Sequence, residues 1–207
     1  MQVLARRYDS GQPIRLTIDA GQIAAVEPLA ESPGSLPWIA PALFDLQING
    51  CDGISFNSAT LTADQVRHVL SVCRLHGIAG LCPTLVTNDF PSLKHGFATL
   101  RRACEEDRQI DAGMPCFHLE GPYISPEDGP RGAHPRQHVR PPSRDEFLRL
   151  QDAAGGRIRL LTLAPEHDNA LDFIAWATAQ GVVVAIGHTA ASGQRIRDAV
   201  AAGARLS

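Results

Sequence analysis

The sequence predicts an α/β protein, a (β/α)8 TIM barrel that is truncated after about five strands. From residue 43 onward, short apolar runs alternate with amphipathic segments, which is typical of parallel strands joined by helical crossovers. Four of the five runs end in polar residues able to do chemistry, as barrel strands do, and no glycine-rich phosphate-binding turn of a doubly wound sheet follows any of them. The chain has 207 residues, whereas a complete barrel takes roughly 250.

The composition excludes several classes of protein. Hydrophobic residues make up 44% of the chain, charged residues 20%, and the net charge is −3, which excludes disordered, collagen-like and coiled-coil chains and argues against a nucleic-acid partner. Apolar stretches fall far short of the roughly 18–20 residues that span a membrane. We expect no secretory signal, because residues 1–13 lack its apolar core and its small-residue cleavage site. Five cysteines without C-x-x-C spacing indicate reduced thiols. We expect a cytoplasmic protein with no nucleic-acid or membrane partner.

The first 40 residues differ in pattern from the rest. Residues 14–28 alternate at period two around a turn, which predicts a β-hairpin, and the proline-rich stretch 31–41 predicts a linker. We expect residues 1–40 to form a small β unit with its linker and residues 41–207 to form the incomplete barrel.

The barrel segment divides into alternating elements. Apolar runs predict strands at 43–48, 80–86, 116–121, 158–164 and 182–187, and the final residues resemble the start of a sixth. Amphipathic spacing predicts helices at 62–77, 92–107, 143–156, 169–181 and 193–203. Ser143 with Glu146 predicts a capping box.

Glu120 is the leading candidate for a functional residue. It lies two residues after His118, so both side chains point to one face of a strand, and Gly121 then ends that strand. An ionisable group on the inner face of a buried parallel strand needs a metal, a cation or a substrate beside it. A structural ion pair with an arginine is the alternative.

Three more strand ends carry polar residues. His188 follows an apolar run and suits zinc, although a hydrogen-bonded core histidine fits as well. Gln47 and Asn49 can hold a water or a substrate carbonyl, or cap loop backbone. Glu166 is either a rim carboxylate or part of a helix N-terminus.

The loop after the third strand predicts part of a substrate pocket. It contains His134, and its arginines face either an anionic ligand or solvent. These arginines are Arg131, Arg136 and Arg140. Four other histidines lie on expected helix faces or loops and are interpreted as structural or solvated groups without partners: His68, His76, His95 and His167.

Five segments together resemble the N-terminal portion of the N-acetylglucosamine-6-phosphate deacetylase family of the amidohydrolase superfamily. They are "APALFDLQINGCDGISFN", "GLCPTLVTND", "FHLEGPYIS…GAHP", "LLTLAPE" and "GVVVAIGHTAAS". The resemblance implies an amidohydrolase-type barrel with part of a small flanking β-sandwich domain, to which residues 1–40 would belong.

The resemblance also implies roles for individual residues. Glu120 and His188 would be metal ligands, and Gln47 would lie near the metal through a water. His134 and Asn49 would be on the substrate side. Many amidohydrolases carry His-x-His at the end of the first strand, where it binds a second metal. Gln47-x-Asn49 stands at that place, as in single-metal members, so the resemblance implies one divalent ion, with zinc favoured. A third histidine ligand and the catalytic aspartate are expected beyond Ser207.

The implied activity is metal-dependent deacetylation of N-acetylglucosamine 6-phosphate to glucosamine 6-phosphate and acetate, in amino-sugar catabolism. The substrate would be a phosphorylated amino sugar, and the family suggests a homodimer at full length. Two alternatives stay open: a catalytically inactive truncated fragment of such a deacetylase, or another hydrolase of the amidohydrolase superfamily.

Overall fold

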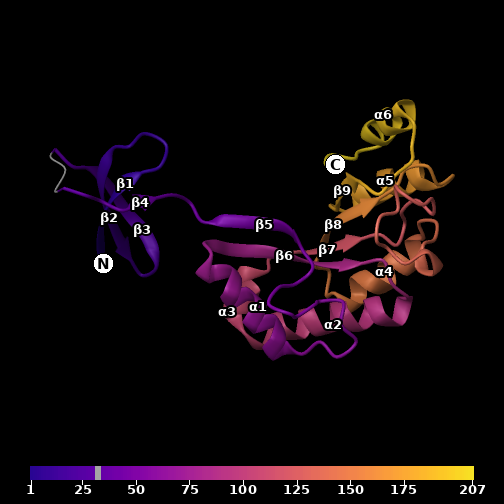
Figure 1. The fold of residues 1–207 in the computed structure, drawn as a ribbon, viewed down its shortest axis with the longest axis horizontal. Helices are drawn as coiled ribbons and strands as arrows, with labels where there is room; N and C mark the ends of the chain where they lie inside the picture. Colours follow the sequence, from indigo (N-terminus) through magenta and orange to yellow (C-terminus); the bar gives the residue numbers. More distant parts are fainter. Residues whose placement is uncertain (31–33) are drawn as a thin grey trace. The chain divides into compact units, whose positions relative to one another are not determined.

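The computed structural model describes residues 1–30 and 34–207, which divide into two compact units, Met1–Ala42 and Leu43–Ser207 (Figure 1). In the first unit the strands are β1 (Gln2–Arg7), β2 (Pro13–Asp19), β3 (Gln22–Pro28) and β4 (Trp38–Ile39), in the sheet order β3-β2-β1-β4. β2 and β3 form the predicted hairpin, and its turn residues Ala20 and Gly21 have φ of 48° and 78°, as a tight hairpin turn requires.

The sequence interpretation of this unit was incomplete. β1 was not predicted, although it pairs with β2 in antiparallel and with β4 in parallel orientation. The predicted linker 31–41 is wrong at 38–39, which pair with β1, and its residues 31–33 lie outside the described part of the chain. The assignment of this unit to a flanking β-sandwich domain stays a prediction.

The second unit is an α/β fold whose sheet is half a barrel. Its five strands run parallel in chain order: β5 (Leu43–Ile48), β6 (Ile78–Val86), β7 (Phe117–Glu120), β8 (Ile158–Leu163) and β9 (Val183–Ile186). All five were predicted within two residues at each end. Leu206 also bridges to Ala185 in parallel, so the expected sixth strand begins there.

Helices connect the strands and lie along one side of the curved sheet (Figure 1). They are α1 (Ala63–Leu75), α2 (Phe90–Glu106), α3 (Arg108–Gly113), α4 (Arg144–Ala153), α5 (Ala170–Ala179) and α6 (Gly193–Ala201), with a 3-10 turn at Arg136–His138. The short helix α3 was not predicted. Within the described residues, no helix has both the length and the apolar character needed to cross a membrane.

Side-chain caps mark where these helices start, except at α5, whose N-cap residue Asn169 makes no such hydrogen bond. The Thr62 hydroxyl accepts a hydrogen bond from the Gln65 backbone, and the Gln65 side-chain oxygen accepts one from the Thr62 backbone, so α1 has a complete capping box. The predicted box at Ser143 is only half formed: Ser143 accepts from the Glu146 backbone, but the Glu146 carboxylate turns to Arg140 and Tyr123 instead.

An aromatic cluster holds the loop after β7 against the helices. Tyr123, at the start of that loop, lies with its ring centroid 5.4 Å from Phe173 of α5, and Phe147 of α4 lies 6.0 Å from the same ring. The Tyr123 hydroxyl donates a hydrogen bond of 3.0 Å to Glu146. All three rings are buried, so the loop that leaves β7 is anchored close to the strand's end.

Candidate metal centre

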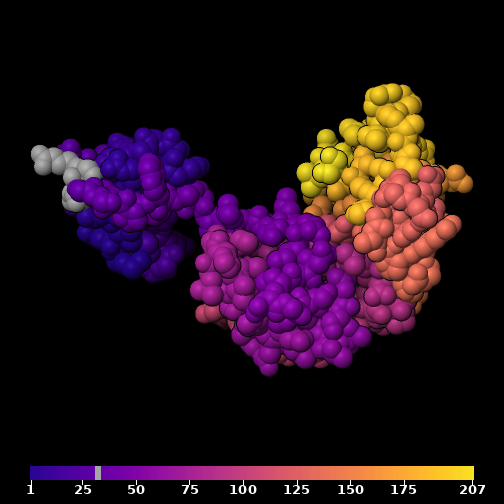
Figure 2. All heavy atoms as spheres, in the orientation of Figure 1, coloured from indigo at the N-terminus to yellow at the C-terminus, as the bar shows by residue number. Residues whose placement is uncertain are grey.

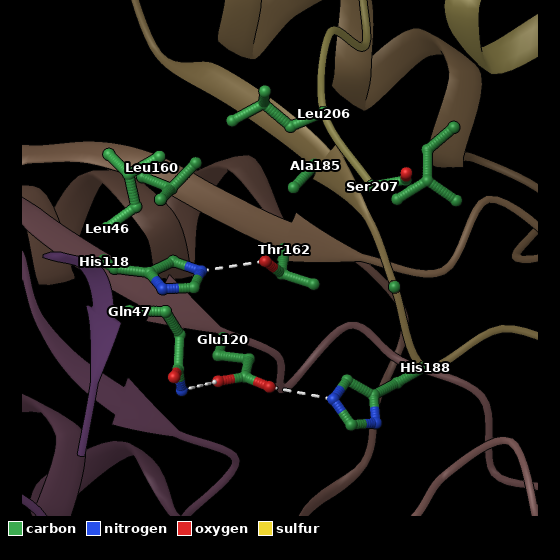
Figure 3. Close-up of a pocket in the computed structure, with 12 residues that line it drawn as sticks. Leu46, Gln47, His118, Glu120, Leu160, Thr162, Ala185, His188, Leu206 and Ser207 are labelled. Atoms are coloured by element: carbon green, nitrogen blue, oxygen red, sulfur yellow. Dashed lines mark hydrogen bonds and ion pairs between the residues drawn. The ribbon is translucent and has the colours of Figure 1, made fainter. Parts of the chain in front are cut away.

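Three of the predicted residues meet at the ends of strands. Glu120 is the last residue of β7, Gln47 lies near the end of β5, and His188 follows β9 by two residues. They line a cavity of about 360 Å³ together with Leu206 and other residues (Figure 3). Figure 2 shows the second unit hollowed between the purple segment around β5 and the yellow C-terminal residues.

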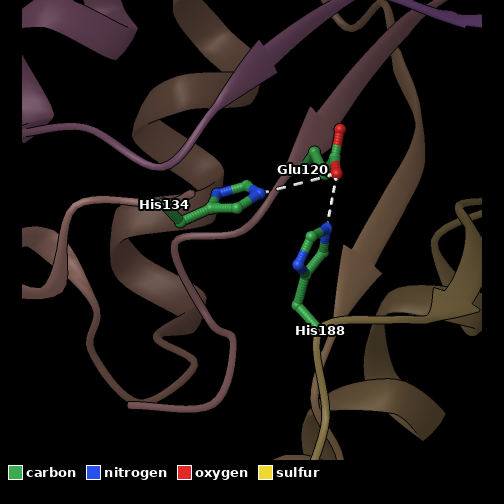
Figure 4. A group of neighbouring side chains, drawn as sticks. All are labelled: Glu120, His134 and His188. Carbon is green, nitrogen blue, oxygen red and sulfur yellow. Dashed lines mark hydrogen bonds and ion pairs between the residues drawn. The ribbon is translucent and has the colours of Figure 1, made fainter. Parts of the chain in front are cut away.

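The Glu120 carboxylate is held on both oxygens. Its Oε1 accepts a hydrogen bond of 2.8 Å from His188 Nε2, and His134 Nε2 lies 3.6 Å from the same oxygen (Figure 4). Its Oε2 accepts a hydrogen bond of 2.9 Å from the Gln47 amide. Hydrogen bonding to His134, then to Gln47 and His188, lowers the pKa of Glu120 to about 2 against the opposing effect of burial. The group is therefore an anion.

His134 is fixed by a residue from another strand-end loop. Its Nδ1 is 2.8 Å from Thr87 Oγ1, and its side chain is buried. Its ring packs edge-on against His188, with centroids 4.2 Å apart. Since Nδ1 is engaged with Thr87, Nε2 is the nitrogen that points to Glu120.

The backbone at His188 is unusual for a residue with a side chain. Its φ is 51°, in the left-handed region that disfavours most residues, and its carbonyl accepts a hydrogen bond of 2.9 Å from the Ser125 backbone. Backbone strain of this kind is common at functional sites. The conformation turns the imidazole back over the end of the sheet toward Glu120, as Figure 4 shows.

Glu120, His134 and His188 could hold a metal ion. Their three potential ligand atoms lie within 4.8 Å of one another. One carboxylate and two imidazoles form a donor set that suits zinc, and three protein ligands are what a catalytic zinc site provides. The sequence analysis paired Glu120 with His188 and, from the family resemblance, assigned His134 to the substrate side. The structure brings all three side chains together, and the substrate role of His134 stays a prediction.

Gln47 and Asn49 form one hydrogen-bonded pair. The Gln47 amide donates to Asn49 Oδ1 at 3.0 Å as well as to Glu120. The Ile48 backbone between them donates to Thr84 Oγ1 at 3.2 Å, which fixes the end of β5 against β6. Both amides thus lie at the expected place, and their proposed roles toward water and substrate stay predictions.

His118 lies deeper in the sheet and does not join the cluster. Its Nε2 is 2.8 Å from Thr162 Oγ1 of β8 (Figure 3). Its Nδ1 is 3.2 Å from Thr84 Oγ1 of β6. Only 3% of His118 is exposed. Burial lowers the pKa of His118 to about 4, although the charge of Glu120 opposes the shift. A neutral imidazole therefore joins three strands beneath Glu120.

This burial predicts acid sensitivity of the fold. Between pH about 6.5 and about 4, the unfolded chain binds a proton at His118 that the folded chain does not bind. The free energy of unfolding should therefore fall by up to about 3 kcal/mol as the pH decreases through that range. His118→Gln should remove this dependence. Urea unfolding at several pH values would measure it, with His95→Gln on the exposed face of α2 as control. Equal pH dependence in both variants would contradict the prediction.

Other candidates have structural partners. Glu166 accepts hydrogen bonds from Thr189 and, at 2.9 Å, from the Ala190 backbone, so it joins the loops after β8 and β9. Arg140 pairs with Glu146 at 2.9 Å and Arg131 pairs with Asp128.

The interpretation of two histidines as lacking partners was wrong. His68 lies 2.6 Å from Asp52, and His167 lies 2.9 Å from the Ile124 carbonyl.

The chain was compared with known proteins by sequence and by structure. No family model matches the chain. It is 37% identical over 173 residues to the human N-acetylglucosamine-6-phosphate deacetylase and 29% identical over 168 residues to that of Bacillus subtilis. The chain is similar to N-acetylglucosamine-6-phosphate deacetylases. Its alignments take in 80% of the chain and about 40% of the length of these curated relatives.

Solved structures agree. The deacetylase from Mycobacterium smegmatis superposes with a TM-score of 0.83 at 30% identity, covering 99% of this chain and 54% of that one. The deacetylase from Pasteurella multocida gives a TM-score of 0.81 at 24% identity, which shows the shared fold. The half-barrel thus has the fold of the corresponding part of these deacetylases.

Proposed function

We propose that the whole protein is a metal-dependent deacetylase that converts N-acetylglucosamine 6-phosphate to glucosamine 6-phosphate and acetate. The observation that carries this proposal is a cluster of one carboxylate and two imidazoles. Glu120 ends β7, His134 lies in the loop after β7, and His188 follows β9. Similarity to deacetylases of that name supports the substrate class, and one related structure is a complex with N-acetylglucosamine 6-phosphate.

Glu120 and His188 would hold one divalent ion, with zinc favoured by the donor set. Gln47 would orient the Glu120 carboxylate through its hydrogen bond to Oε2 and hold a water near the ion. His134 would lie against the substrate or complete the ligand set, since its Nε2 lies 3.6 Å from Glu120 Oε1. Asn49 would keep the Gln47 amide turned toward Glu120.

The chemistry follows from these placements. A divalent ion bound here would polarise the acetyl carbonyl and acidify a water molecule. The low pKa of Glu120 keeps its carboxylate ionised, so it would neutralise part of the charge of a bound ion across the whole physiological range. His134, buried and fixed by Thr87, is a ready hydrogen-bond donor to a substrate oxygen.

The proposal predicts zinc-dependent release of amine from N-acetylglucosamine 6-phosphate by the protein purified from its own cells. Chelation should abolish the activity and zinc should restore it. Free N-acetylglucosamine should react at least about tenfold more slowly, because a bound phosphate positions the sugar. Equal rates for both sugars would indicate a different amidohydrolase, and absence of acetate release at full metal occupancy would overturn the deacetylase proposal.

A second substrate deserves the same assay. Curated relatives from Shewanella and Escherichia coli, each 31% identical to this chain, are N-acetylgalactosamine-6-phosphate deacetylases. A higher kcat/KM with that epimer would reassign the substrate and leave the metal centre unchanged. The homodimer and the cytoplasmic location stay predictions.

A further inference from the structure

Two cysteines lie side by side inside the half-barrel. Cys82 is in β6 and Cys116 directly precedes β7, and their Sγ atoms are 2.9 Å apart. The parallel register pairs Thr84 with His118, so the two cysteines, each two residues earlier, are opposite each other on the same face. The thiol pair therefore lies one layer below the Thr84–His118 contact.

We propose that Cys82 and Cys116 are a modification site at which a hydroperoxide forms an intramolecular disulfide. Neighbouring strands are about 4.7–4.9 Å apart, within the Cα separation of about 4.4–6.8 Å that a disulfide tolerates. The sulfurs must approach by less than about 1 Å to reach a bond of about 2.05 Å. No rearrangement of the sheet order is needed.

The two thiols differ in reactivity. A hydrogen bond from the Cys82 thiol lowers the pKa of Cys116 to about 7, burial opposes this shift, and the charge of Arg159 adds to it. The same hydrogen bond, together with burial and Asp45, raises the pKa of Cys82. Cys116 is half-buried and Cys82 is fully buried. Cys116 is thus the attacking thiolate and Cys82 the resolving thiol.

The reaction balances as two displacements. The Cys116 thiolate attacks one oxygen of the hydroperoxide, the O–O bond breaks, and hydroxide or alkoxide leaves, which gives a sulfenic acid on Cys116. The Cys82 sulfur then attacks the Cys116 sulfur, an S–S bond forms, and the hydroxyl leaves as water with the Cys82 proton. Two electrons pass from the sulfurs to the peroxide.

The other cysteines provide an internal comparison. Burial raises the pKa of Cys104 to about 11, and burial with the neighbouring Cys51 raises the pKa of Cys73 to about 11. Cys51 and Cys73 are therefore the competing pair, with a less acidic thiol. Selective oxidation at Cys82 and Cys116 is what the proposal requires.

The sequence makes the assignment direct. Trypsin releases Cys82 in residues 75–94 and Cys116 in residues 109–131, while Cys51, Cys73 and Cys104 fall in three other peptides. After brief treatment of the full chain with hydrogen peroxide, a non-reducing digest should contain 75–94 linked to 109–131. Dithiothreitol should separate the two. In Cys116→Ser, thiol loss should be at least about tenfold slower, since the acidic thiol is gone.

Controls separate this result from general oxidation. Cys104→Ser should form the link as the unmodified chain does, and Cys82→Ser should stop at a sulfenic acid on Cys116 that dimedone traps. Three results would overturn the proposal. The first is that peroxide converts Cys116 of the unmodified chain to sulfinic or sulfonic acid without forming the Cys82–Cys116 disulfide. The others are faster formation of a Cys51–Cys73 disulfide, or a disulfide found only between two chains on a non-reducing gel.

Discussion

Glu120→Gln should weaken zinc binding by the chain about 100-fold or more. The change removes the anionic ligand and leaves two imidazoles and an amide, whereas loss of a supporting group around a metal already costs about 10–100-fold in affinity. The amide has nearly the volume of the carboxylate, so the fold should persist. Titration of the protein with zinc in competition with a chromophoric chelator would measure the change.

Glu127→Gln is the matched control for this experiment. Glu127 lies exposed in the same loop, so its substitution removes one negative charge close in sequence without touching the cluster. Its zinc affinity should equal that of the unmodified chain. Unchanged affinity in Glu120→Gln would remove Glu120 from the ligand set, and an equal loss in both variants would indicate a long-range charge effect instead.

Gly121→Ala should destabilise the second unit by roughly 3 kcal/mol and weaken zinc binding. Gly121 has φ of 78°, which costs other residues about 1–2 kcal/mol. A Cβ there would lie 2.1 Å from Thr87 Oγ1, and such overpacking costs about 1–3 kcal/mol. Displaced Thr87 would also release His134. Urea unfolding and the zinc titration would measure the two effects.

Gly129→Ala is the control that separates the cost of a left-handed backbone from the cost of the steric clash with Thr87. Gly129 is in the same loop and has φ of 94°, but a Cβ there would meet nothing within 4 Å. It should lose only about 1–2 kcal/mol through backbone conformation and keep its zinc affinity. If both variants lost equal stability and both kept their zinc affinity, the contact between Gly121 and Thr87 would not support the site.

The regular part of the fold was predictable because each signal is local. A glycine beside an apolar run indicates where a strand ends. A capping residue, such as Asp89 or Ser143, indicates where a helix begins. β4 spans only Trp38–Ile39 and exists because it pairs with β1, more than thirty residues away in the chain. A two-residue strand has no periodicity to detect.

The candidate site was predictable where strand ends determine it. Glu120 and His188 follow apolar runs, so topology alone brings them to one edge of the sheet. His134 was placed in the right loop but not in the cluster. Its orientation depends on Thr87, 47 residues earlier, and the approach of His188 depends on its left-handed backbone and on Ser125. Such tertiary contacts leave no mark in the neighbouring sequence.

The order of the strands has a consequence for synthesis of the protein. Because β5 to β9 pair in the order in which they occur in the chain, each strand finds its neighbour already made as it leaves the ribosome, and the sheet can grow one strand at a time. Glu120 and His188 are 68 residues apart, with β8 emerging between them. A nascent chain therefore presents an incomplete donor set until β9 has docked, so capture of a metal ion by Glu120 and His188 would be a late event that marks a correctly assembled half-barrel.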